Sequence, residues 1–327
     1  MTHKTKWFLP VWALAGALAF SACSDDDDDN GTPAPPTGPT QNIVEIASAN
    51  EQYSILVDAL VATQLVPLLE SDGPFTVFAP DNDAFNALFD ELGIEDANND
   101  GSRVDDLAAA VGVQAVSAIL QYHVLGASIP AAEVPANAYV TTASTASPGD
   151  NQLSLLVQSG AGVTLNGSTN VTAPDIFATN GVIHGIDAVL TLPTIVDHAA
   201  NNPALFEELV GAVAAADLVE TLSGDGPFTV FAPRNEAFEE IAGVVAGLTT
   251  EQLTTVLTYH VVAGNVRSGD LADGPVTTVS GQDVTVALGE AVTIIDTDGG
   301  VSTVLAPDVQ GTNGVVHMID RVLLPEL

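Results

Sequence analysis

One eight-residue stretch occurs twice in this chain of 327 residues, at Gly73 to Pro80 and again at Gly226 to Pro233. Both copies read Gly-Pro-Phe-Thr-Val-Phe-Ala-Pro, and each runs on to an Ala-Phe pair. An identical octapeptide at two distant places indicates a tandem duplication. The length allows about two domains, each with its own core, so we expect two similar domains.

The octapeptide has the pattern of a buried strand. Apolar residues fall on both of its faces, which is typical of a strand that is covered on both sides. Pro80 should end the strand, and Asp81 should cap a short helix that buries Phe85. None of its side chains is a strong nucleophile or a good metal ligand, so the predicted role is architectural.

Three further features recur in both halves of the chain. Each repeat opens with helical periodicity, with Pro203 suited to a helix start in the second repeat. A later helix ends in a Tyr-His pair, at Tyr122-His123 and at Tyr259-His260. Each repeat closes on Asn-Gly-Val-x-His-x-Ile-Asp, from Asn180 and from Asn313, in which Asn-Gly predicts a turn before a strand. Between them, alternating segments divided by turn residues predict antiparallel strands at 153–157, 163–165, 284–288 and 292–295.

Residues 1–22 have the pattern of an export signal. Two lysines precede an apolar run from Trp7 to Phe20, which is about as long as a signal core and short for a bilayer span. The run leads into Ser21-Ala22-Cys23, which resembles the lipobox of bacterial lipoproteins, where the signal is cut and the cysteine thiol is lipidated. The alternative is an incidental cysteine near an ordinary cleavage site. Cys23 is the only cysteine, so an intramolecular disulfide is excluded.

Residues 23–42 are expected to form a tether. The acidic run Asp25 to Asp29 resembles the signal that sends some lipoproteins to the outer face of the outer membrane, and it also suits a solvated spacer. The Pro-rich stretch after it cannot form a core. We therefore expect an exported outer-membrane lipoprotein, exposed at the cell surface and held by its lipid anchor alone.

The charge of the chain is strongly unbalanced. Its formal net charge is −36 at pH 7, with only six Lys and Arg residues. Such a surface repels phosphate backbones, so we expect no nucleic-acid partner. The acidic excess suits solubility, and cation binding is the alternative interpretation.

The octapeptide, the Tyr-His pair and the closing phrase, in that order and twice, resemble the fasciclin (FAS1) domain family. The resemblance covers about residues 43–327. It implies an α/β fold of the α+β type, in which each domain is a wedge or sandwich of β-strands with packed helices. The expected domains are 43–193 and 194–327. The resemblance also implies a role in extracellular adhesion or matrix association.

The family resemblance supplies two sets of candidate adhesion residues. The first is the Tyr-His pair, which the family implicates in packing and in receptor interaction, and which consists here of Tyr122, His123, Tyr259 and His260. The second is a Pro-Asp-Ile motif before the closing phrase. Asp175 and Ile176 match it after Pro174, whereas Asp308 is followed by Val309, which departs from the family's Ile.

The first repeat contains extra residues that suggest a metal site. Pro80 and Tyr122 are 42 positions apart, against 26 for Pro233 and Tyr259, so this interval is 16 residues longer in the first repeat. The extra segment includes Asp96, Asn98 and Asp100 before Gly101, which is how a calcium loop begins. The twelfth position is a leucine and not the usual glutamate. A calcium site and a solvated acidic insertion both remain open, and no other cofactor is expected.

The paired histidines raise the question of catalysis. His123, His184, His260 and His317 occupy matching positions, and an acidic residue near each pair could complete a zinc site or orient a base. However, each lies in an apolar run, where a histidine is more often buried and bonded to the backbone. No Ser or Cys accompanies both copies, so we expect no enzyme.

The sequence therefore predicts a non-enzymatic surface protein for adhesion or matrix association. Its expected partner is a cell-surface or matrix protein or a glycan. The alternative is a lipoprotein that binds a small molecule or a glycan in the groove between the repeats, because the junction at Pro193 and Thr194 leaves no long linker.

Overall fold

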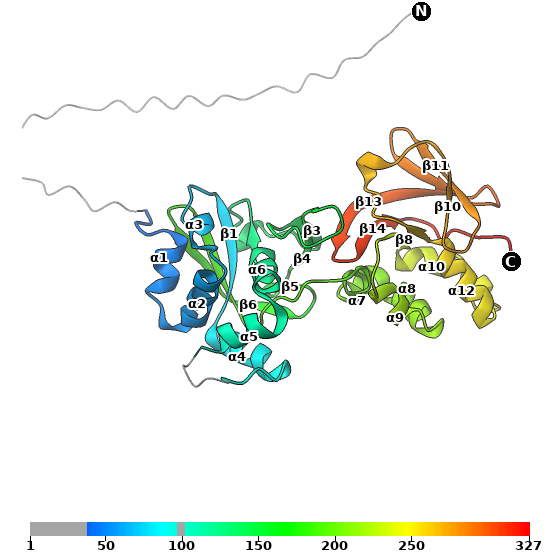
Figure 1. The fold of residues 1–327 in the computed structure, drawn as a ribbon. Helices are drawn as coiled ribbons and strands as arrows, with labels where there is room; N and C mark the ends of the chain where they lie inside the picture. Colours follow the sequence, from blue (N-terminus) through cyan, green and yellow to red (C-terminus); the bar gives the residue numbers. More distant parts are fainter. Residues whose placement is uncertain (1–37, 97–101) are drawn as a thin grey trace, which may run out of the picture. The chain divides into compact units, whose positions relative to one another are not determined.

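The computed structural model describes residues 38–96 and 102–327 (Figure 1). The predicted signal peptide, Cys23 and most of the tether lie outside the described residues, as do Asn98 and Asp100 of the predicted calcium loop. Those predictions concern parts of the chain that are not described.

The first repeat alternates helices with strands in the predicted order. Its α-helices are α1 (Ile43–Ser48), α2 (Ser54–Ala62), α3 (Val66–Leu69), α4 (Asn82–Glu91), α5 (Arg103–Val111) and α6 (Val113–Tyr122), with short 3₁₀ turns η1 (Glu51–Tyr53) and η2 (Ala131–Glu133). Its strands are β1 (Phe75–Pro80), β2 (Val124–Leu125), β3 (Ala138–Thr141), β4 (Ser154–Ser159), β5 (Val163–Leu165), β6 (Thr169–Ala178) and β7 (Gly181–Ile186).

The second repeat has the same succession of elements. Its α-helices are α7 (Ile195–Ala200), α8 (Pro203–Ala215), α9 (Val219–Ser223), α10 (Asn235–Glu240), α11 (Ala242–Val245) and α12 (Thr250–Tyr259), with the 3₁₀ turn η3 (Ser268–Asp270). Its strands are β8 (Phe228–Pro233), β9 (Val261–Ala263), β10 (Gly274–Thr277), β11 (Asp283–Leu288), β12 (Val292–Ile295), β13 (Val301–Gly311) and β14 (Gly314–Ile319). The four predicted strand segments are confirmed to within one or two residues.

Each repeat is built on one seven-stranded sheet. The strand order is β2-β1-β7-β6-β5-β4-β3 in the first repeat and β9-β8-β14-β13-β12-β11-β10, read in the same sense, in the second. The octapeptide strand pairs in parallel with the closing strand in both repeats, and all other neighbours are antiparallel. The mixed α/β fold predicted from the sequence is therefore confirmed, with the duplication visible in the topology.

A long strand divides each sheet into two halves. In β6 the pairing with β7 shifts register between Ala173 and Ile176, and in β13 it shifts between Ala306 and Val309. Asp175 and Asp308 lie within these irregular stretches and have positive φ angles of 60° and 64°. Such bulges bend a strand, which lets one sheet enclose its own core as a wedge.

The octapeptide strands lie in the interior, as predicted. All residues of β1 except Phe75 are buried, and Asp81 caps α4 by accepting the backbone N–H of Ala84 at 2.8 Å. A side chain at Gly73 or Gly226 would overlap the backbone carbonyl of Asn180 or Asn313, so glycine is required there. The octapeptide is thus fixed by its fit against the closing phrase.

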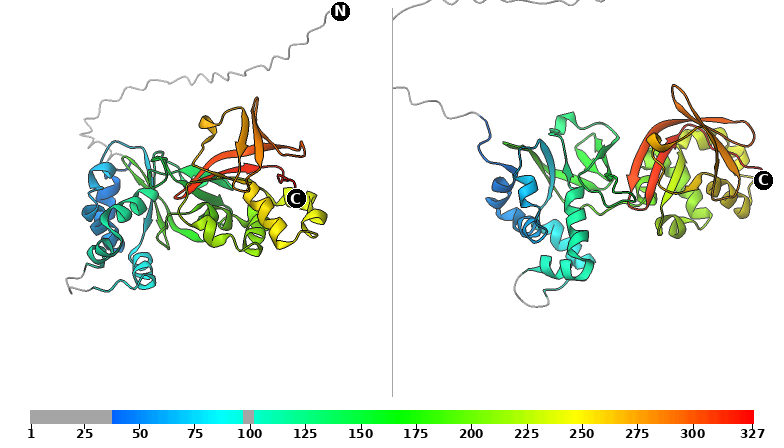
Figure 2. Two further views of the ribbon diagram at one scale, coloured as in Figure 1. Left: turned by 45° about the vertical axis from the view of Figure 1, so that its right-hand side comes forward. Right: turned by 45° about the horizontal axis from the view of Figure 1, so that its top comes forward.

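Helices cover the parallel strand pair in each repeat. In Figures 1 and 2, α1 and α2 lie beside β1, and the corresponding cluster of buried side chains joins these helices to β1 and β7. In the second repeat, α7, α8 and α12 bury Phe206, Leu209 and Val256 against β8 and β14. A second cluster in each repeat contains the tyrosine of the Tyr-His pair.

Within the described ranges, no single helix has the length and apolarity needed to cross a bilayer. Helices α5 and α6 satisfy that test only when taken together, and they meet at an angle of 107°.

Candidate functional site

The Tyr-His pairs lie in the interior of both repeats. Tyr122 and Tyr259 are fully buried, and their hydroxyl groups donate to the backbone carbonyls of Ser154 and Asp283, each at 2.9 Å. A partner would meet these side chains only if the repeat opened. The structure therefore assigns them a packing role, which is one of the two roles that the family resemblance implies.

The histidine of each pair bridges two backbone segments. His123 Nδ1 donates to the carbonyl of Ile119 at 2.7 Å, and its Nε2 accepts the N–H of Leu190 at 2.9 Å. His260 repeats this arrangement with Val256 and Leu323. Burial lowers the pKa of both rings to about 4, so both are neutral at pH 7.

The histidines of the closing phrase hold the bulged strand in place. His184 accepts the N–H of Asp175 with Nδ1 and donates to the carbonyl of Ile129 with Nε2. His317 does the same for Asp308 and Val266. Each ring also stacks on the second phenylalanine of the octapeptide, with centroids 5.7 Å and 5.8 Å apart.

These contacts leave the four paired histidines no free nitrogen for a substrate or a metal. Every ring uses both nitrogens on backbone groups, as expected for structural histidines. Across residues 38–96 and 102–327, no group of three or more His, Cys, Asp or Glu side chains is arranged to hold a metal ion. The calcium hypothesis rests on residues that are mostly not described, and it stays a prediction.

The Pro-Asp-Ile motif of the first repeat lies at the surface. Pro174 and Phe177 are exposed, with a relative accessibility of 54% for Phe177, while Asp175 and Ile176 are half-buried. The Asp175 carboxylate accepts the N–H of Ala131 at 2.8 Å. The motif therefore combines a carboxylate with an exposed aromatic side chain.

The matching motif of the second repeat is occupied by internal contacts. The Asp308 carboxylate accepts the N–H and the hydroxyl of Ser268, and it lies 3.7 Å from Nε of Arg267. Val309 is buried, and Gln310, which stands where the first repeat has Phe177, is fully buried. The two copies of the motif thus differ in how accessible they are to a binding partner.

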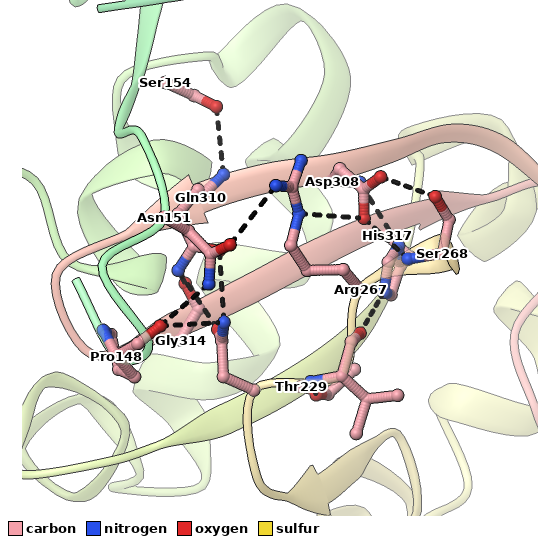
Figure 3. A network of polar contacts seen from close by, with 12 residues as sticks. Pro148, Asn151, Ser154, Thr229, Arg267, Ser268, Asp308, Gln310, Gly314 and His317 are labelled. Atoms are coloured by element: carbon pink, nitrogen blue, oxygen red, sulfur yellow. Dashed lines mark hydrogen bonds and ion pairs between the residues drawn. The ribbon is translucent and has the colours of Figure 1, made fainter. Parts of the chain in front are cut away.

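Gln310 is buried because it is part of the contact between the repeats (Figure 3). Its backbone N–H donates to the hydroxyl of Ser154 at 2.9 Å, and its side chain binds Asn265 and the carbonyl of Gly314. Nearby, Arg267 donates to Asn151 at 3.3 Å. The polar side chains drawn together in Figure 3 come from both repeats.

Sequence reasoning missed several of these residues. The Asn-Gly pattern predicts only a turn at Asn180 and Asn313, yet each side chain forms three hydrogen bonds to backbone groups of the opening helices and of the segment before the octapeptide. The loop before Ser154, which contains Asn151, is longer than its counterpart in the second repeat. The Thr142 hydroxyl bonds to Leu153, eleven residues later, whereas the Thr278 hydroxyl bonds to Gln282, only four residues later. That length difference is the feature of the sequence that could have indicated the contact made by this loop.

Comparison with known proteins supports the same family. The Fasciclin domain family matches residues 51–193 and 204–325. "Protein sll1483" of Synechocystis sp. is 45% identical over 143 residues, which are 41% of this chain and 74% of that protein. The transforming growth factor-beta-induced protein ig-h3 of Sus scrofa is 30% identical over 269 residues, 80% of this chain but only 36% of that protein. The cell surface glycolipoprotein MPB83 of Mycobacterium bovis is 33% identical over 194 residues, 57% of this chain and 78% of that protein.

The duplicated topology and these matches define a protein made of two fasciclin domains. The chain belongs to the fasciclin family.

Proposed function

We propose that this protein is a non-enzymatic adhesion or matrix-association protein of the cell surface. It is tethered to the outer membrane through a lipidated Cys23, and it binds a cell-surface or matrix protein or a glycan. The family membership supports the adhesive role. The name of one relative, a cell surface glycolipoprotein, supports the location.

The binding segment is the Pro-Asp-Ile motif of the first repeat. The observation that carries this assignment is the contrast at one matched position, where Phe177 is 54% exposed and Gln310 is fully buried. Aromatic side chains, phenylalanine included, are enriched in protein–protein interfaces. The second copy is engaged by Ser268 and Arg267, so it has less to offer a partner.

A binding assay with matched surface variants tests the assignment. The protein is applied to a panel of purified matrix proteins and to a glycan array, as wild type, as Phe177→Ser and as Val301→Ser. Val301 is 52% exposed on β13 of the second repeat, so both substitutions remove a similarly exposed apolar side chain. We expect Phe177→Ser to weaken binding at least tenfold and Val301→Ser to leave it unchanged. Equal binding by all three proteins would refute the assignment.

A further inference from the structure

A cavity of about 330 Å³ lies where the second repeat meets the first. Its wall comes from the second repeat at α7, α8, β13 and β14, including Phe206 and Met318, and from the first repeat at Asn137, Ala138 and Tyr139. The volume falls within the range of small-molecule sites in proteins, at its lower end.

The two repeats differ in sequence beside the cavity. Asn82 accepts the N–H of Ile55, and Asn235 accepts the N–H of Glu208 in the same way. This equivalence aligns the two repeats, so that Phe206 occupies the position in the second repeat that Tyr53 occupies in the first. In the first repeat the Tyr53 hydroxyl fills the space above Gly185, where an added Cβ would lie only 2.6 Å from it. The second repeat has Phe206 and Met318 at these two places, so the Met318 side chain, and not a tyrosine hydroxyl, occupies this position. Tyr139 of the first repeat covers the cavity beside Phe206 and Met318.

The cover over the cavity is held by several contacts. The Tyr139 hydroxyl donates to the carbonyl of His198 at 2.9 Å, and its ring meets the His198 ring edge-on with centroids 5.4 Å apart. The amides of Asn137 and Asn202 bind each other reciprocally at 3.1 Å and 3.2 Å. The cavity is therefore bounded by side chains that already have defined positions, which favours binding without a large ordering cost.

The wall chemistry selects a neutral ligand. Within the described residues, the wall contains no Asp, Glu, Lys or Arg, and most of it is aliphatic or aromatic. Its polar side-chain groups are the amides of Asn137 and Asn202, the ring of His198 and the hydroxyl of Tyr139, which is already bonded to the carbonyl of His198. The net charge of −36 further disfavours an anion.

The His198 ring is held by the backbone and contributes mainly its apolar edge to the wall. Its Nε2 donates to the carbonyl of Gln310 at 3.0 Å, so in the neutral ring Nδ1 is an acceptor. Among the described residues Nδ1 has no hydrogen-bond partner although it is buried. This nitrogen has almost no accessible surface, so the side chains that can bond a ligand hydroxyl or N–H from the cavity are the amides of Asn137 and Asn202.

We propose that this cavity binds a small, neutral, largely apolar molecule with one hydroxyl or N–H group, held between the two repeats. The site is separate from the Pro-Asp-Ile motif of the first repeat and goes beyond the adhesive role. Because residues of both repeats form the wall, a bound molecule would also brace the two repeats against each other.

The only two methionines make the test specific. Met318 lines the cavity, and Met1 lies in the leader outside the described residues. The chain is labelled with ¹³C-methyl methionine and carries Cys23→Ser, which avoids detergent that would compete for an apolar cavity. It is titrated with 2-naphthol, a neutral aromatic alcohol, and separately with the anion naphthalene-2-sulfonate.

We expect 2-naphthol to shift the Met318 methyl resonance saturably, with a dissociation constant of roughly micromolar to millimolar size for so small a probe. The sulfonate should cause no saturable shift. Ala199→Leu fills the cavity from α7 and should weaken 2-naphthol binding at least tenfold. Ala200→Leu adds the same atoms one position further on, at an exposed site, and should change nothing.

Two results would overturn the proposal: no saturable shift of Met318 up to the solubility limit of 2-naphthol, or equal binding by wild type and a folded Ala199→Leu variant. If Ala199→Leu does not fold, Phe206→Tyr replaces it, because the first repeat has tyrosine at this place. That variant should also weaken binding, and unchanged binding would again count against the site.

Discussion

At the scale of single residues, buried polar side chains fix the position of each repeat's closing phrase. Asn313 accepts the N–H of Ile195 at 3.0 Å and donates to the carbonyls of Leu222 and Gly224 at 2.8 Å and 2.9 Å. Asn180 makes the equivalent three bonds in the first repeat. One amide thus joins the first helix, the segment before the octapeptide and the last hairpin.

Asn313→Ala is therefore expected to lower the free energy of unfolding by about 2–4 kcal/mol, because it leaves three backbone groups without their partner. Urea unfolding followed by circular dichroism measures the change. Asn170→Ala is the control: its amide also forms hydrogen bonds, but it is exposed, and the expected loss is below about 1 kcal/mol. Equal losses in the two variants would contradict this interpretation of Asn313.

The buried histidines make stability depend on pH. The pKa of His123 is about 4 in the folded protein because burial penalises the charged ring, against an ordinary value of 6.5. The unfolded chain therefore binds more protons between these values, and folding stability is lost as the pH falls from about 6.5 toward 4. His260 and His198 add contributions of the same sign.

The pH effect can be isolated with His123→Gln, which has no titrating group at this position. The many carboxylates also titrate in this range, so the informative quantity is the difference in unfolding free energy between wild type and variant. We expect the stability advantage of the wild type to shrink by about 2 kcal/mol between pH 7 and pH 5. An advantage that is the same at both pH values would show that His123 does not titrate as described.

At the scale of elements, the short helix α7 depends on a strand from the other repeat. The carbonyl of His198 belongs to the last turn of α7, where helix carbonyls lack partners within the helix. The Tyr139 hydroxyl of β3 donates to it, and burial raises the pKa of that hydroxyl to about 12. A strand of the first repeat thus completes the end of the first helix of the second.

Substitution of Tyr139 should loosen α7. Tyr139→Phe loses one hydrogen bond, about 1 kcal/mol, whereas Tyr139→Ala also loses the ring, about 3 kcal/mol. Hydrogen exchange of a peptide covering α7 should rise slightly in the first variant and strongly in the second. α1, which is the counterpart of α7 in the first repeat, should keep its exchange rate in both. No change in α7 would argue against this contact.

At the scale of the whole molecule, the predicted function depends on where the two repeats are held. The lipid anchor at Cys23 is a prediction from the leader, and the residues around it are not described. Two or more acyl chains hold a protein firmly on a membrane, whereas one chain is marginal.

Cys23→Ser is therefore expected to move the protein from the membrane fraction to the soluble fraction. Detergent phase partitioning of cell extracts measures this, with Ser24→Ala as the neighbouring control that should stay with the detergent. A Cys23→Ser protein that still partitions into detergent would exclude the thiol as the attachment point.

Much of the fold was readable from the sequence because it depends on local patterns that occur twice. The octapeptide, the Asp81 cap and the strands 163–165 and 292–295 follow from alternation, capping and turn chemistry, and duplication doubled each signal. The paired histidines were also correctly expected to be structural, because an apolar run around a histidine predicts its burial.

The sequence by itself determined the family, the number of repeats and those helices and strands that carry a clear periodicity, since these depend on residue order. Only the tertiary structure decided which copy of each motif is accessible to a partner. Asp175 and Asp308 lie in similar sequence motifs. The fold, however, packs three parts of the first repeat against the second: Ser154, Tyr139 and the loop that contains Asn151. The same contacts bury Gln310 and enclose the cavity beside Phe206, while Phe177 stays exposed. Burial at such a contact depends on which surfaces meet across distant parts of the chain, and no local pattern records it.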